Sequence, residues 1–70
     1  MWVKTYYGAL VNLSYAMLLR VVRKEHEIEG VTFEVRAIMY YSESYTALYS
    51  YATEEEAEEK LNSLLKLLTN

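Results

Sequence analysis

The sequence predicts an α+β fold, in which a four-stranded antiparallel sheet is covered on one face by a single C-terminal amphipathic helix. Three observations support this class. Residues 31–37 alternate between apolar and polar side chains, residues 45–52 form another strand-like segment, and a leucine-rich segment of helical periodicity follows directly. A sheet with an apolar face needs a second layer to cover it, and this helix is the available element. We therefore expect residues 1–70 to form one domain.

The first strand is expected at residues 2–7, which are rich in aromatic and β-branched side chains. Gly8 follows, and glycine readily adopts the positive φ that a tight turn requires. We therefore expect the chain to reverse at this glycine.

The second strand is expected at residues 10–23, although residues 10–22 are also compatible with a helix. Apolar side chains recur there at near-helical spacing, at Leu10, Leu13, Met17 and Val21. Strand is favoured over helix because the side chains of residues 17–22 also alternate, and because the polar segment 23–29 ends at Gly30 like a hairpin loop. The pattern alone leaves both alternatives open.

The third strand is expected at residues 31–41. The apolar Val31, Phe33, Val35 and Ala37 share one face, and polar residues occupy the other. From residue 38 onward both faces are apolar, so we expect both to be covered. Residues 42–44 are expected to form a short turn that leads into the fourth strand at residues 45–52.

The helix is expected at residues 54–68. Thr53 is a favourable N-cap residue, and Glu56, three positions later, completes a capping box. Acidic residues occupy the first turns, which complements the helix dipole. The expected buried stripe consists of Ala57, Leu61, Leu64, Leu65 and Leu68.

Several short motifs have a familiar arrangement: MWVK at residues 1–4, Gly8, LVNL at residues 10–13 and TEEEAE at residues 53–58. In these features the chain resembles a loose group of small, mostly uncharacterised bacterial and phage proteins. The resemblance implies a β-β-β-β-α order over nearly the whole chain, and it transfers no catalytic or binding residues. This chain departs from the group in its high tyrosine content and in a longer polar loop around His26.

Size and composition restrict the possible functions. A chain of 70 residues buries only about 60% of its unfolded surface, and without cysteine it has no disulfide to supplement its core. Homo-oligomerisation is then the expected supplement. A net charge of −3 argues against nucleic-acid binding, and the apolar run at residues 9–19 contains polar residues that argue against a membrane span or an export signal. We expect a cytoplasmic protein.

The sequence offers little for catalysis. His26 is the only histidine, and it is flanked by Glu25, Glu27 and Glu29 in what we expect to be an exposed loop tip. A catalytic base needs a pocket and an orienting partner, which a loop tip does not supply. We therefore expect neither an enzyme, nor a metal site, nor a cofactor.

Tyrosine is unusually frequent, with eight copies. Tyrosine is favoured both in cross-strand pairs and in protein interfaces. Because one helix covers one sheet face, we expect some tyrosines to form a protein-binding surface on the other face, with Tyr40, Tyr41, Tyr45 and Tyr49 as the candidates. The expected function is a non-catalytic interaction module that self-associates. The alternative is a phage-type acidic inhibitor, or host-takeover protein, that binds a host protein.

Overall fold

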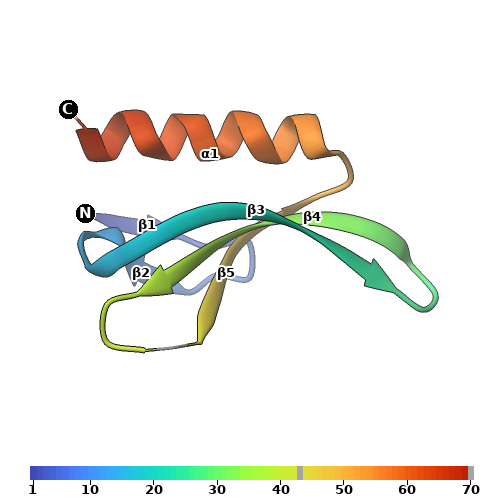
Figure 1. Cartoon of the computed structure of the whole chain (residues 1–70), viewed down its shortest axis with the longest axis horizontal. Coiled ribbons are helices and arrows are strands. Elements are labelled where there is room, and N and C mark those ends of the chain that lie inside the picture. Colours follow the sequence, from blue (N-terminus) through green and yellow to red (C-terminus); the bar gives the residue numbers. More distant parts are fainter. Residues whose placement is uncertain (43, 70) are drawn as a thin grey trace.

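A computed structural model of the chain describes residues 1–42 and 44–69, and it places one helix across one face of a small antiparallel sheet (Figure 1). This arrangement confirms the α+β class. In chain order the elements are β1 (Trp2–Lys4), β2 (Leu10–Asn12), the 3₁₀ turn η1 (Leu13–Tyr15), β3 (Ala16–His26), β4 (Gly30–Met39), β5 (Tyr45–Tyr51) and α1 (Glu54–Thr69).

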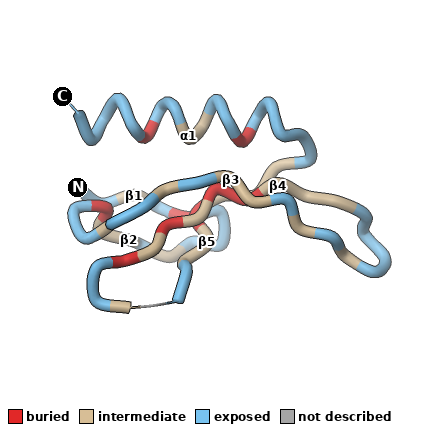
Figure 2. Tube along the Cα trace, viewed as in Figure 1, coloured by how far each residue is buried: buried red, intermediate tan, exposed pale blue. Residues whose placement is uncertain are grey.

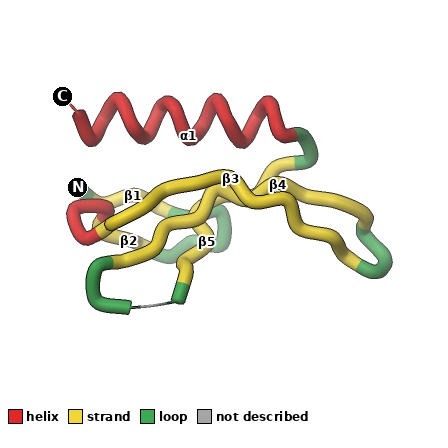
Figure 3. The backbone as a smooth tube through the Cα atoms, viewed as in Figure 1, coloured by secondary structure: helices red, strands yellow, loops and turns green. Residues whose placement is uncertain are grey.

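The prediction of a single four-stranded sheet is wrong. The described residues form a three-stranded sheet of order β3-β4-β5 and a separate two-stranded sheet of β1 and β2 (Figure 3). The segment expected as one strand at residues 10–23 is divided into β2, η1 and β3. The helical alternative is wrong as well, because only three residues, Leu13 to Tyr15, are helical there.

The polar residues of this segment explain the division. The side chain of Asn12 accepts a hydrogen bond of 3.0 Å from the backbone N–H of Ser14, which caps η1 and ends β2. The turn then directs Leu13 into the core, where it is 1% exposed.

The first strand is also shorter than residues 2–7. The hydroxyl of Thr5 accepts a hydrogen bond of 3.0 Å from the N–H of Ala9, and its carbonyl accepts one from Gly8. These bonds replace the strand ladder beyond Lys4. The chain reversal at Gly8 is confirmed, with a φ of +88° that suits glycine.

The β3–β4 hairpin extends further than predicted. The expected loop at residues 23–29 is wrong at its start, because β3 continues to His26, which pairs with Gly30. His26 is therefore a strand residue, and its Nε2 lies 2.8 Å from the hydroxyl of Thr32. This end of the hairpin projects beyond the start of α1 (Figure 1).

The predicted alternation along β4 is confirmed. Val35, Ala37 and Met39 are buried in one cluster with Ala57 and Leu64 of α1. Figure 2 shows the buried positions of β4 under this helix. On the opposite face Ile38 is half-buried, whereas Tyr40 and Tyr41 follow the strand and are exposed. The fourth expected strand corresponds to β5, and the expected turn at residues 42–44 includes Glu43, which lies outside the described residues.

The helix begins at Glu54, as predicted. Thr53 accepts a hydrogen bond from the N–H of Glu56, while its hydroxyl donates one of 2.9 Å to the Glu56 carboxylate. The return bond of the capping box therefore ends on the threonine hydroxyl, whereas the motif would place it on the backbone N–H.

The predicted leucine stripe is buried only in its central part. Ala57 and Leu64 are buried and Leu61 is half-buried, but Leu65 and Leu68 are exposed. Leu65 lies at the side of this stripe, and Leu68 lies in the last turn of α1, so both remain partly in solvent. Within residues 1–42 and 44–69, α1 is too polar and too short to cross a membrane, and no other helix qualifies.

Candidate interaction surface

The four tyrosines expected to form one binding surface lie in different places. Tyr40 and Tyr41 follow β4 in a turn and are exposed. Tyr45 is opposite Ile38, on the sheet face away from α1. Tyr49 is opposite Val35 on the helix side, with the Lys60 ammonium 4.4 Å from its ring centre. The structure therefore brings together only the first two.

These two tyrosines belong to a cluster at one end of the sheet. The rings of Tyr41 and Tyr15 are 6.1 Å apart in an edge-on arrangement, and the N–H of Tyr40 donates a hydrogen bond of 2.6 Å to the carbonyl of Tyr15. Beside them is a shallow hollow of about 470 Å³, which Met17 and Ile38 also line. Aromatic edges and thioether atoms make this end apolar.

The sheet face away from α1 is polar at its centre, contrary to the expectation of an apolar tyrosine patch. Glu34 is buried there at 4% exposure, and Arg36 donates a hydrogen bond of 2.8 Å from Nε to its carboxylate. Two ion pairs also reach this carboxylate, from Arg36 Nη2 at 2.8 Å and from Lys24 Nζ at 3.9 Å. The Arg36 guanidinium in turn lies 3.9 Å from the ring centre of Tyr45. These contacts pair the buried carboxylate with two cations.

The most distinctive surface feature is the outer edge of β3. In the three-stranded sheet β3 pairs with β4 on one side only, and no other described strand lies beside it. The far edge of β5 is partly occupied, since Tyr6 donates a backbone hydrogen bond of 3.0 Å to Leu48. An uncovered strand edge presents unpaired N–H and C=O groups that can pair with another chain.

Exposed apolar side chains accompany this edge. Met17 and Leu18, at the start of β3, are 65% and 46% exposed. On α1, Lys60 faces Tyr49 of β5. Leu65 is five residues later, and at about 100° per residue it lies roughly 140° around the helix from Lys60. This places Leu65 on the side of α1 nearest β3, which we call the β3 flank. Leu65 is 42% exposed. We call the outer edge of β3 together with these three side chains the β3 edge surface.

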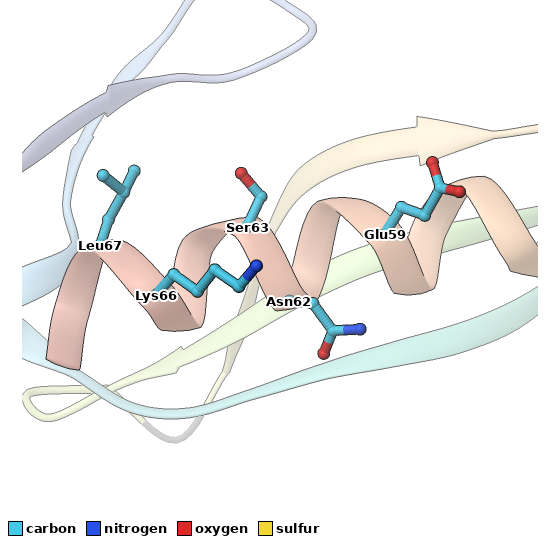
Figure 4. Close-up of a pocket in the computed structure, with 5 residues that line it drawn as sticks. All are labelled: Glu59, Asn62, Ser63, Lys66 and Leu67. Carbon is cyan, nitrogen blue, oxygen red and sulfur yellow. The ribbon is translucent and has the colours of Figure 1, made fainter.

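The hollow drawn in Figure 4 does not form a site. It is lined by Glu59, Asn62, Ser63, Lys66 and Leu67, all from a single helix (Figure 4). Among the described residues, no second element contributes to this lining. The described residues also contain no cluster of three or more potential metal ligands, and none of their buried side-chain nitrogen or oxygen atoms lacks a hydrogen-bond partner.

Comparison of the chain with protein-family models, with curated proteins and with solved structures gives no match.

Sequence reasoning directed attention to tyrosine and did not identify the β3 edge surface. A signal was present in residues 16–22, which contain one charged residue, Arg20, among apolar neighbours. A strand buried on both sides would have the same composition, so the sequence does not say whether its edge is free.

Proposed function

We propose that this protein is a non-catalytic interaction module that self-associates through the β3 edge surface. The observation that carries the proposal is the unpaired outer edge of an eleven-residue strand. Proteins commonly protect such edges, and pairing with a second copy is one way to do so.

The small core supports this proposal. Its fully buried apolar side chains are few, and they come from η1, β4, β5 and α1, namely Leu13, Val35, Ala37, Met39, Leu48, Ala57 and Leu64. The chain has no cysteine to form a disulfide. Domains of this size often gain stability from oligomerisation, and an edge contact would also cover Leu18 and Leu65.

Sedimentation equilibrium over a dilution series tests the proposal. We expect a concentration-dependent shift from the chain mass of 8.2 kDa to twice that value. Leu65→Ser should weaken association, whereas the matched variant Leu67→Ser should not. Leu67 is 52% exposed and is seven residues from Lys60, which places it on the β5 flank.

A monomer at every concentration would contradict this proposal and favour the second candidate, an acidic inhibitor that binds a host protein. That candidate is supported by the resemblance to small phage proteins and by the exposed carboxylates at the start of α1, which are Glu54, Glu55, Glu58 and Glu59. Negative charges on a rigid helix favour a partner with a basic surface. Charge-reversing these glutamates should leave self-association unchanged and abolish capture of that partner.

A further inference from the structure

We infer that two copies of the chain pair in antiparallel fashion along β3, about a two-fold axis that passes through Val21. This inference rests on the proposed function and specifies its partner and register. In such a contact Val21 lies opposite its own copy, and Leu18 of each chain lies opposite Lys24 of the other.

The length of the usable edge restricts the centre to Val21 or Val22. Val21 is the midpoint of β3, which runs from Ala16 to His26. The ladder to β4 has a β-bulge between Ala16 and Leu18, and a bulge turns an edge away from regular pairing. Regular pairing therefore begins at Leu18. By symmetry it ends at Lys24 for a centre at Val21 and at His26 for a centre at Val22.

The positions of the cations select Val21. A centre at Arg20 or at Arg23 places an arginine opposite its own copy, and a centre at Val22 places Arg20 opposite Lys24. Like charges directly opposite one another destabilise a strand pair. A centre at Leu19 avoids this repulsion but requires pairing through the bulge at Met17.

Pairing about Val21 instead places every cation opposite an apolar residue. Arg20 meets Val22, Arg23 meets Leu19 and Lys24 meets Leu18, so each long aliphatic stem packs beside an apolar side chain. The Lys24 ammonium stays 3.9 Å from the Glu34 carboxylate of its own chain. Residues opposite each other across the dimer then differ by an even number of positions along β3. Side chains on the α1 face of one chain therefore lie beside side chains on the α1 face of the other. The result is a continuous sheet of order β5-β4-β3-β3-β4-β5 with both helices on one face.

Because the chain contains no cysteine, single cysteines report this register directly. Residues opposite each other in antiparallel strands have Cα atoms about 4.5–5.5 Å apart, within the range that a disulfide spans. Under mild oxidation Val21→Cys should form a covalent dimer. Leu19→Cys and Arg23→Cys, on the same face, should not, because each lies four positions from its copy, or roughly 13 Å along the strand.

A charge substitution gives an independent measurement. Leu18→Glu should tighten the dimer through two contacts with Lys24, and Leu18→Lys should weaken it, each by about two- to tenfold in Kd at low salt. Leu10→Glu and Leu10→Lys are the controls, since Leu10 is also an exposed strand leucine but lies on β2. Neither control should change the Kd.

The possible outcomes are distinguishable. Two results would overturn the register and leave the proposed function intact, provided that the native protein dimerises. One is cross-linking that is strongest at position 19 or 23. The other is a Leu18→Lys dimer that is as tight as the Leu18→Glu dimer. Native protein that remains monomeric overturns both. Maximal cross-linking at position 21 together with the opposite effects of the two Leu18 variants supports the inference.

Discussion

Leu64 is the helix residue whose truncation should be most costly. Its side chain is 2% exposed and belongs to the same buried cluster as Val35 and Ala37 of β4. Replacing a buried leucine with alanine typically costs about 2–5 kcal/mol, because transfer free energy is lost and a cavity remains. Alanine is a good helix former, so this cost does not come from helix propensity.

This loss is large for so small a protein. At about 0.05–0.15 kcal/mol per residue, a chain of 70 residues has a free energy of unfolding of roughly 4–10 kcal/mol. Leu64→Ala should therefore remove about half of the stability and lower the Tm by about 10 °C or more. Leu67→Ala, at an exposed position of the same helix, should change the free energy of unfolding by no more than about 0.5 kcal/mol.

Urea and thermal unfolding followed by far-ultraviolet circular dichroism measure both variants. The experiments should be made at one low protein concentration, so that self-association does not add to the apparent stability. Equal free energies of unfolding for Leu64→Ala and Leu67→Ala would refute the packing of α1 on the sheet described above.

Further substitutions test other parts of the structure. Thr53→Ala should destabilise the protein by about 1 kcal/mol and Thr53→Ser should have little effect, and identical melting curves for all three proteins would contradict the cap. Tyr40→Ser should leave the sedimentation profile unchanged, because Tyr40 is outside the β3 edge surface; a shift to monomer would restore the tyrosines as the contact. Burial, then Tyr49 and Glu56, raise the pKa of Tyr51 above its ordinary value of 10.0. The folded state thus holds this proton more tightly, so stability should fall as the pH rises above about 10, and the fall should be smaller in Tyr51→Phe; identical pH profiles would exclude this contribution.

Several features of the fold depend on local chemistry and can be predicted from neighbouring residues. Thr53 and Glu56 are close in the chain, so their hydrogen bonds form with little help from distant residues, and the start of α1 was predicted to the residue. Gly8 fixed the first reversal in the same way through its positive φ. The alternation along β4 predicted which side chains α1 covers, because the two faces of a strand differ in polarity.

Other features depend on contacts between distant parts of the chain, so local patterns do not predict them. The Asn12 side chain could have faced solvent from a continuous strand, and its bond to Ser14 became decisive once Leu13 entered the core. The order of the strands left β3 at an edge, although its apolar composition suits an internal strand equally well. Tyr45 and Tyr49 lie on opposite faces of the sheet, because a bulge shifts the register between them. Strand register sets the face of each side chain, and the composition of the segment does not encode it.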